Sequence, residues 1–286
     1  MLTNNSMETL YDNGIYKERF SWYFTTKFLD GFNDTLNELE PDYNSFVYVG
    51  GSSFFYRCLL EYGGDGALAF RGFDSADMVS FSPWVIYTAL SVMHTSEKGF
   101  LYDFSIQNSA VSLDRLIIPL YLGGGGVLEP NFILKIYTNS YDRDKVFLYD
   151  RALTRFRCIL DPYEKLALST NMFVLVPSLR DMFILKMDMI DESRSKLRVS
   201  DEVDILTLVE LAYRQGTDFS YFLRSLDQSR QSYNSRDARV LDLHRLFKYP
   251  DYVNSIAPRN YLLFPPSEVL SDCFYRTSEF IKSAGM

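Results

Sequence analysis

The sequence FVYVGGSSFFYRCLLEYGGDGALAFRGFDSADMVSF, residues 46–81, decides the fold. It begins with a short apolar run over residues 46–49 that predicts a buried strand. Glycines and serines follow directly, and residues 54–62 then place apolar side chains on one face of a helix. A second strand comes next and carries Asp74 and Asp77 at its start. The stretch therefore predicts a strand, a glycine turn, a helix and an acidic strand, with Asp77 close to the turn.

The glycine turn has the composition of an anion-binding site. Gly50 and Gly51 let the backbone approach a ligand closely, and either Ser52 or Ser53 can cap the helix that follows. The N–H groups of the first helical turn then point toward the ligand. The simpler interpretation is a strand–helix–strand turn with acids at the surface and no ligand.

This arrangement resembles the nucleotidyltransferase superfamily with a DNA polymerase β-like core and, within it, the group of AbiEii-type toxins. The pattern of that group is a strand, Gly-Gly or Gly-Ser, a helix, and then Arg-x-Thr-x-Asp-hydrophobic-Asp. Gly50, Gly51 and Ser52 match the glycine turn. Arg71 matches the arginine, and Asp77 matches the second aspartate.

The sequence departs from this pattern at two positions. Phe73 stands where the family has threonine, and Ser75 stands where the first metal-binding aspartate is expected. Asp74 lies one position too early to replace that aspartate simply, because neighbouring residues of a strand face opposite sides. The motif is therefore present with one carboxylate missing.

A second segment, VPSLRDMFILKM over residues 176–187, also resembles the family. There a strand ends in a proline-containing turn, and the helix that follows carries a Leu-x-x-x-Lys pattern whose lysine points toward the triphosphate. Lys186 matches that lysine, and on the simpler interpretation it is a surface lysine on an amphipathic helix. A basic turn over residues 194–198 leads to Asp201 and Asp204, which match two acids of the family, while Ser200 replaces a basic residue.

The resemblance implies three overlapping sets of site residues. The predicted nucleotide-binding residues are Gly50, Gly51, Ser52, Ser53, Arg71 and Lys186. The predicted metal ligands are Asp77, Asp74 and Asp103. The predicted catalytic residues are Asp77, Asp74 and Lys186. Asp103 is one candidate for a third carboxylate from a neighbouring strand, and Asp142, Asp144 and Asp150 are others; each taken alone is also explained as a solvated acid in a turn.

The composition limits the class of protein. The 286 residues are 47% hydrophobic and 16% aromatic, which excludes disorder for most of the chain. The formal net charge of −8 argues against a broad nucleic-acid-binding surface, although it leaves room for a local basic groove. The cysteines Cys58, Cys158 and Cys273 are far apart and predict buried thiols, and two histidines are too few for a histidine-rich metal site. The sequence contains neither a membrane-spanning run nor a signal peptide, so we expect a cytoplasmic protein with no membrane partner.

The pattern along the chain predicts an α+β fold, a nucleotidyltransferase-like mixed sheet with flanking helices followed by a helical C-terminal region. The division into domains is 1–177 and 178–286, with an amphipathic helix over residues 17–39 at the start. Strands are predicted at 100–106, 113–122, 132–138, 146–149 and 171–176. A helix pattern, broken by Pro162, covers 160–168. Further helices are predicted at 84–93, 179–193, 202–214, 218–226, 237–247 and 266–283.

Two functions of different class follow from the resemblance. The first is a nucleotidyltransferase that moves a nucleotide from a nucleoside triphosphate to an RNA or protein hydroxyl with Mg²⁺, and that pairs with an antitoxin-like protein. The alternative is a catalytically inactive descendant that acts as a nucleotide-binding or protein-interaction module. Ser75 cannot supply the charge that a pair of dications requires, so the sequence leaves enzymatic activity open.

Overall fold

The structure is a computed structural model of the chain. It describes residues 31–39, 46–69, 75–80, 88–93, 102–104, 110–111, 115–122, 132–138, 147–150, 155–158, 164–167, 173–189, 199–228, 233–248 and 265–286. Of the predicted N-terminal helix, residues 31–39 are helical, and the remainder lies outside the described residues. Of the predicted helix over residues 84–93, residues 88–93 are helical.

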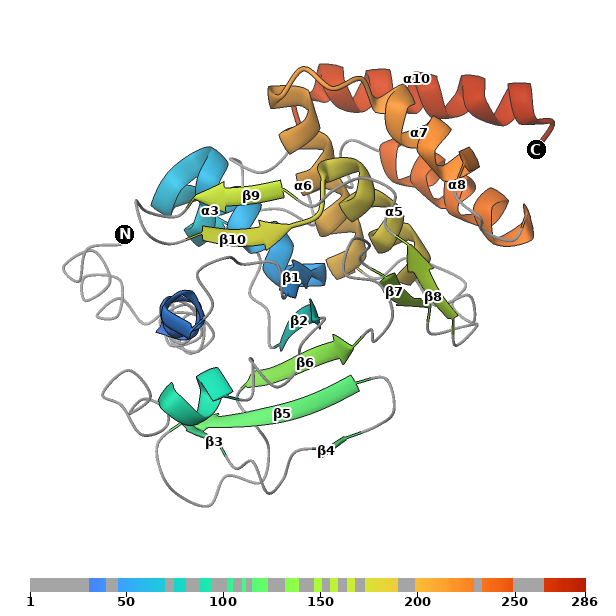
Figure 1. Cartoon of the computed structure of the whole chain (residues 1–286). Helices are drawn as coiled ribbons and strands as arrows, with labels where there is room; N and C mark the ends of the chain where they lie inside the picture. The colour runs from blue at the N-terminus through green and yellow to red at the C-terminus, as the bar shows by residue number, and fades with distance from the viewer. Residues whose placement is uncertain are drawn as a thin grey trace. The chain divides into compact units, whose positions relative to one another are not determined.

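The chain forms two compact units, each built from several segments. The first consists of Met1–Tyr56, Gly72–Leu148 and Arg157–Pro177, and the second of Arg57–Arg71, Tyr149–Phe156 and Ser178–Met286. The large sheet belongs to the first unit, and the helices that follow residue 178 belong to the second (Figure 1). The division into domains 1–177 and 178–286 stays a prediction.

A mixed sheet forms the centre of the first unit. Its strands, in spatial order, are β1 (Phe46–Val49), β2 (Ser75–Ser80), β6 (Phe132–Thr138), β5 (Arg115–Leu122) and β3 (Tyr102–Phe104), and β4 (Ala110–Val111) also pairs with β5. Only the β2–β6 pair is parallel among these pairings; the others are antiparallel. Ala76, Met78 and Leu134 are fully buried and share one face of the sheet, because Leu134 pairs with Ala76. This sheet and the helices of the second unit confirm the predicted α+β class.

The helix α3 (Gly50–Ala69) begins directly after β1, earlier than the predicted start at residue 54. Gly50 turns the chain with a φ of 60°, a conformation that glycine adopts without the steric cost of a Cβ atom. Gly51, Ser52 and Ser53 lie inside the first turn of the helix rather than in a separate loop. The glycine turn of the sequence is therefore a single glycine hinge between strand and helix.

Two smaller sheets complete the strands. β9 (Glu164–Ala167) pairs with β10 (Phe173–Val176), and β7 (Phe147–Asp150) pairs with β8 (Arg155–Cys158). The helix pattern at residues 160–168 is thus wrong. Pro162 disfavours a helix there, and the chain instead gains antiparallel hydrogen bonds by folding back onto the apolar β10.

A hydrogen-bonded chain of polar side chains is buried in the first unit. Asn33, from the helix over residues 31–39, donates to the hydroxyl of Tyr56 at 2.6 Å. The hydroxyl of Tyr48 donates to Asn33 Oδ1 at 2.6 Å, and the two tyrosine rings lie 4.9 Å apart. All three residues are fully buried, so these bonds satisfy groups that would otherwise be costly to remove from water. They fix the start of α3 against β1.

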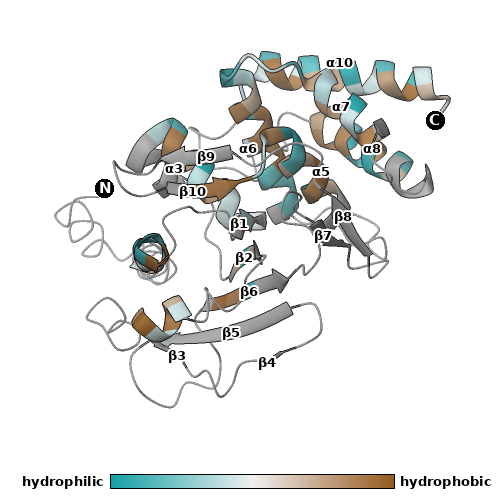
Figure 2. Cartoon of the chain, in the orientation of Figure 1, coloured by the Kyte–Doolittle hydropathy of each residue, from teal (hydrophilic) through white to brown (hydrophobic). Residues whose placement is uncertain are grey.

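Helices make up most of the second unit, as predicted. They are α5 (Leu179–Met189), α6 (Val199–Arg214), α7 (Phe219–Gln228), α8 (Tyr233–Lys248) and α10 (Ser267–Ala284). Ser178 caps α5 by accepting the N–H of Asp181, and Gly285 ends α10 in a left-handed conformation. Hydrophobic and hydrophilic residues alternate along α10 in Figure 2, as in a helix that buries one face. None of the helices in the described ranges is both long and apolar enough to cross a bilayer.

His244 joins α8 to α10 as a structural residue, in agreement with its amphipathic surroundings in the sequence. Its Nε2 lies 3.1 Å from Ser278 Oγ, and its ring lies 4.7 Å from that of Phe274. The hydroxyl of Ser278 donates to the Phe274 carbonyl, so the imidazole N–H donates to Ser278 Oγ. Burial, followed by the charge of Lys248, lowers the pKa of His244 below its ordinary value of 6.5.

We expect this lowered pKa to make stability depend on pH. The unfolded chain binds a proton more readily than the folded one, so the contribution of His244 is complete above pH 6.5 and is lost as the pH falls through the folded pKa. Urea midpoints measured at pH 7.5 and 5.5 should therefore differ less for His244→Gln than for the natural chain. An equal or larger difference in the variant contradicts the assignment.

Candidate functional site

The carboxylate of Asp77 faces the first residue of α3. In the antiparallel pairing of β1 with β2, Asp77 lies opposite Val49, the residue directly before Gly50. A Cβ atom added to Gly50 would stand 3.2 Å from Asp77 Oδ2, and Ser52 Oγ lies 3.3 Å from the Asp77 carbonyl oxygen. The prediction that Asp77 lies close to the glycine turn is confirmed.

A lysine stands beside this aspartate. The parallel register of β2 and β6 places Lys135 opposite Asp77, and its Nζ lies 4.0 Å from Asp77 Oδ1. Sequence reasoning missed Lys135. The signal was a single charged residue in the middle of the apolar strand FILKIYT. The site therefore holds one negative and one positive side chain beside the amino end of a helix.

The two serines of the motif turn their hydroxyls toward backbone. Ser53 Oγ donates to the Gly50 carbonyl at 2.8 Å, and Ser52 Oγ donates to the Asp77 carbonyl. Both residues are buried. A ligand at this turn would therefore meet the backbone N–H groups rather than these side chains.

The other predicted site residues are not brought to Asp77 in the described part of the chain. Arg71 and Asp74 lie outside the described residues, as do Asp142 and Asp144. Asp103 belongs to β3, and Asp150 ends β7 in a separate sheet. Since β6 and β5 stand between β2 and β3, the backbone at Asp103 is three strand spacings, about 14 Å, from β2.

The described residues do not fit a two-metal centre. Among them no group of three His, Cys, Asp or Glu side chains could hold a metal ion. Asp77 is the one predicted ligand whose side chain is described, and the Lys135 ammonium beside it competes with a dication for the same carboxylate. One Mg²⁺ bound mainly by the phosphates of a ligand needs a single carboxylate, and Asp77 fits that role.

Lys186 has two aspartate partners within the second unit. Its Nζ lies 2.7 Å from Asp201 Oδ1 and 2.7 Å from Asp204 Oδ2. The exposed fractions of these side chains are 14%, 3% and 1%, so the group is nearly removed from water. Asp201 and Asp204 are three residues apart and therefore share one face of α6, and Asp201 lies in the first turn, where the helix dipole favours acids. Lys186 is thus neither a surface lysine nor a free cation.

A second charged cluster holds the carboxyl-terminal part of α3 to α6. Arg214 Nε donates to Glu210 Oε1 at 2.7 Å, the Tyr62 hydroxyl donates to the same oxygen at 3.3 Å, and the guanidinium lies 4.4 Å from the centre of the Tyr62 ring. Burial, and then the charge of Glu210, raises the pKa of Tyr62. Burial, and then the charge of Asp204, likewise raises the pKa of the Cys58 thiol. Cys58 is therefore a protonated core thiol, as the sequence predicts.

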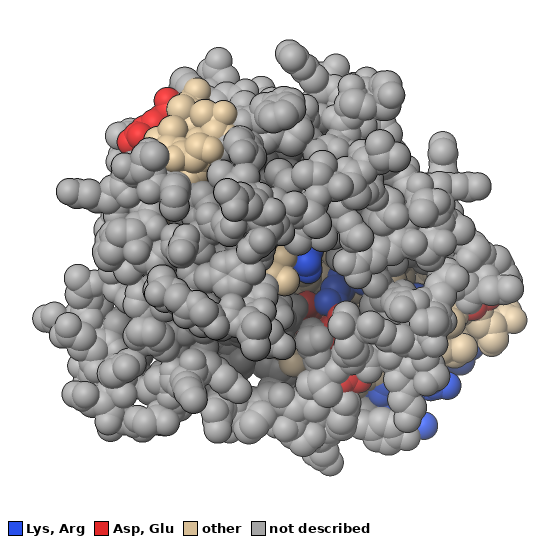
Figure 3. All heavy atoms as spheres, turned by 90° about the horizontal axis from the view of Figure 1, so that it is seen from below, with Lys and Arg blue, Asp and Glu red and all other residues tan. Residues whose placement is uncertain are grey.

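The described charges are mixed rather than segregated. On the face drawn in Figure 3, the described lysines and arginines lie among aspartates and glutamates.

No family model matches the sequence, and no curated protein matches it either. Three solved structures are similar to this chain, each with a TM-score below 0.5. A candidate nucleotidyltransferase from H. pylori has a TM-score of 0.43 at 13% identity, covering 93% of this chain and 97% of that chain. JHP933 from Helicobacter pylori has a TM-score of 0.42 at 12% identity, with coverages of 93% and 94%. The Megavirus polyadenylate synthase has a TM-score of 0.29 at 11% identity, with coverages of 90% and 49%.

Proposed function

We propose that this chain is a nucleotidyltransferase-fold protein that binds a nucleoside triphosphate at the Gly50 hinge. The observation that carries the proposal is the placement of the Asp77 carboxylate against Gly50, at the amino end of α3. Strand, glycine hinge, helix and acidic strand converge on this point in the order that the motif predicts. Lys135 of β6, which pairs with β2, places its positively charged side chain beside Asp77.

Each group has a distinct part in this binding. The first-turn N–H groups of α3 would receive a phosphate, which the helix dipole also favours. Because Gly50 has no Cβ atom, the Asp77 carboxylate can stand directly against the amino end of α3. Lys135 would neutralise phosphate charge, and Asp77 would hold the Mg²⁺ that a triphosphate carries; that ion would screen the repulsion between phosphate and carboxylate. The resemblance also predicts Arg71 and Lys186 for this role; Arg71 lies outside the described residues, and Lys186 is held by Asp201 and Asp204, so the proposal does not use it.

The charge balance favours binding over transfer. Two dications require more than one carboxylate, and the position of the first motif aspartate is taken by Ser75. The inactive nucleotide-binding module is therefore the function we favour. Transfer to an RNA or protein hydroxyl is the second candidate, and it needs Asp74 to complete the carboxylate pair. An antitoxin-like partner belongs to that second candidate, whereas a cytoplasmic location is proposed for both.

Nucleotide binding is tested by thermal stability. Ligand present at ten times its Kd should stabilise the folded chain by about 1.4 kcal/mol. We expect ATP, GTP, CTP or UTP with Mg²⁺ to raise the melting temperature, and Lys135→Met to weaken the binding by about tenfold. Lys282→Met, which removes an exposed lysine from α10, is the matched control and should bind as the natural chain does. If all four nucleotides leave the melting temperature unchanged at millimolar concentration, the proposal fails.

Transfer is tested separately with labelled nucleotides, offered together with total RNA and with the protein itself. We expect little or no label on either acceptor with the natural chain. Transfer that appears in Ser75→Asp identifies a scaffold that has lost one carboxylate. Transfer by the natural chain that disappears in Asp77→Ala establishes the enzyme and overturns the inactive assignment.

A further inference from the structure

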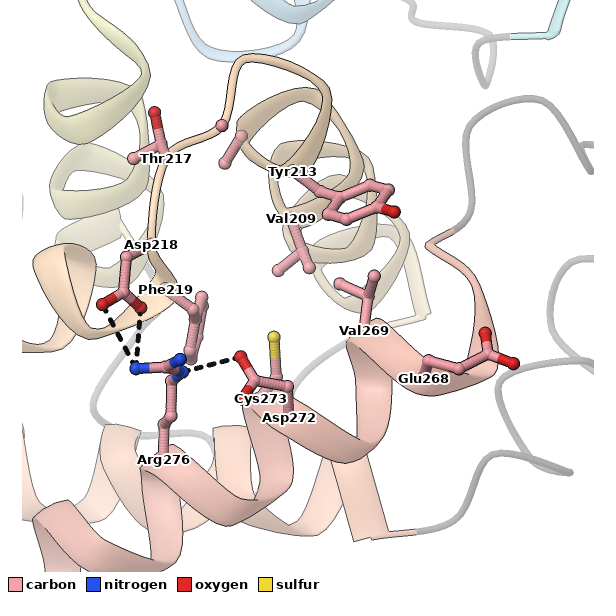
Figure 4. A pocket seen from close by; sticks show the side chains of 12 residues that line it. Val209, Tyr213, Thr217, Asp218, Phe219, Glu268, Val269, Asp272, Cys273 and Arg276 are labelled. Carbon is pink, nitrogen blue, oxygen red and sulfur yellow. Dashed lines mark hydrogen bonds and ion pairs between the residues drawn. The ribbon is translucent and has the colours of Figure 1, made fainter.

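A pocket opens in the second unit, and none of its lining residues is among those proposed to bind nucleotide. α6, α7 and α10 line it together with the turn at Gly216, and its volume is ≈ 430 Å³ (Figure 4). These helices belong to the same compact unit, so the pocket is a feature of that unit alone. No residue of the pocket takes part in the glycine hinge or in the Lys186 cluster.

The floor of the pocket is apolar. Val209, Phe219, Val269 and Cys273 project toward it from the three helices (Figure 4). Burial, together with the charge of Asp272, raises the pKa of Cys273 to about 12, so this thiol is protonated and neutral at physiological pH. The floor therefore suits an apolar side chain and offers no nucleophile for covalent chemistry.

The rim of the pocket is acidic. Asp218, Glu268 and Asp272 provide three carboxylates, and Arg276 is the one basic residue of the lining. Arg276 Nε lies 2.6 Å from Asp272 Oδ2, and Arg276 Nη1 lies 3.0 Å from Asp218 Oδ1. The charge of Arg276 is therefore already compensated within the rim. The lining retains a formal charge of −2, and Glu268 has no cation opposite it among the side chains of Figure 4. A ligand that complements the rim is positively charged.

One exposed tyrosine lines the pocket, and a second lies on α10 outside the lining. Tyr213 lines it and is 53% exposed, and Tyr275 is 63% exposed one position before Arg276 on α10. They are the two most exposed of the large hydrophobic side chains in the described ranges. Tyrosine is enriched where proteins bind one another, because its ring gives contact area and its hydroxyl stays hydrated. These residues favour a polypeptide as the occupant over a small molecule that the pocket encloses.

We propose that this pocket docks a basic amphipathic segment of a partner protein. An apolar side chain of that segment fills the floor between Val209, Val269 and Phe219. A lysine or arginine one helical turn away pairs with Glu268, and Tyr213 covers the junction. The proposal is independent of nucleotide binding, because it uses neither the residues nor the unit of the Gly50 hinge.

The test uses the full chain and three labelled synthetic peptides of twelve residues. The first carries leucine and lysine at helical spacing, the second replaces leucine by serine, and the third replaces lysine by glutamate. Fluorescence anisotropy should give the tightest binding for the first peptide, with the other two at least about tenfold weaker. Equal binding of the serine peptide would mean that general charge attraction explains the result, and it overturns the proposal.

Variants locate the binding on the chain. Glu268→Gln and the pocket-filling Val269→Trp should each weaken the first peptide by about tenfold, as expected for a charge pair and an anchor at the centre of an interface. Glu279→Gln is the matched control, because it removes an exposed carboxylate from the same helix outside the pocket. Glu268 is exposed, so its variant tests the proposal even if Val269→Trp fails to fold. If Glu279→Gln and Glu268→Gln lose the same amount of peptide affinity, the proposal is overturned. It is also overturned if the chain does not bind the peptide and instead associates with itself in a concentration-dependent way that Val269→Trp abolishes.

Discussion

Replacing Lys186 by methionine is expected to lower the free energy of unfolding by about 3–5 kcal/mol. The substitution keeps the length of the side chain but leaves Asp201 and Asp204 without the ammonium that lies 2.7 Å from each. Both carboxylates are almost completely buried, and two like charges near one another in a medium of low dielectric constant repel strongly. The unpaired acids, rather than any lost packing, account for the expected loss.

Chemical denaturation followed by circular dichroism measures this effect. The triple variant Lys186→Met, Asp201→Asn, Asp204→Leu removes all three charges and should recover most of the stability, because a buried ion cluster and a neutral replacement of similar volume are often equal in energy. Lys282→Met, which breaks an exposed pair with Glu279, should cost less than about 1 kcal/mol. If Lys186→Met also lowers the free energy of unfolding by less than about 1 kcal/mol, solvent reaches the cluster. Lys186 would then be available to a triphosphate.

The regular elements with strong patterns were predictable from sequence. β1 and β6 have the predicted bounds, because each is an apolar run between turn residues, and α6 starts and ends within three residues of its prediction. β9 was missed because Glu164-Lys165-Leu166-Ala167 has no strand composition of its own. Its conformation comes from pairing with β10, which is a tertiary effect that a local pattern does not contain.

The sequence predicted most residues of the candidate site but not which of them contact one another. The glycine motif placed Gly50 and Asp77 together, since a short strand–helix–strand unit leaves few ways to arrange them. Lys135 is more than fifty residues from Asp77 in the sequence, and only the parallel register of β2 and β6 makes them neighbours. Lys186, Asp201 and Asp204 were each identified, but the sequence did not indicate that the aspartates hold the lysine. Choice of partner between distant segments is the information that local patterns lack.

Replacing Gly50 by alanine is expected to cost about 2–3 kcal/mol of stability and to abolish nucleotide binding. Two effects add. The φ of 60° lies in the left-handed region, where an L-residue is strained by about 1–2 kcal/mol. The new Cβ would also stand 3.2 Å from Asp77 Oδ2, so the carboxylate must move away from the amino end of α3. The added methyl group and the displaced carboxylate would then disturb the amino end of α3, where the proposed ligand binds.

Gly216→Ala separates these two effects, because Gly216 has a nearly identical φ of 68° and no atom within 4 Å of the added Cβ. It should show the strain alone, about 1–2 kcal/mol, with nucleotide affinity unchanged. In an Asp77→Ala background, the stability lost on Gly50→Ala should decrease to that lost on Gly216→Ala, because the carboxylate oxygen that the methyl group meets is gone. If Gly50→Ala costs no more than Gly216→Ala in the natural background and retains nucleotide affinity, the close approach of Gly50 and Asp77 is not where the ligand binds. The proposed site must then be abandoned, whereas a loss of affinity confined to Gly50→Ala ties nucleotide binding to this hinge.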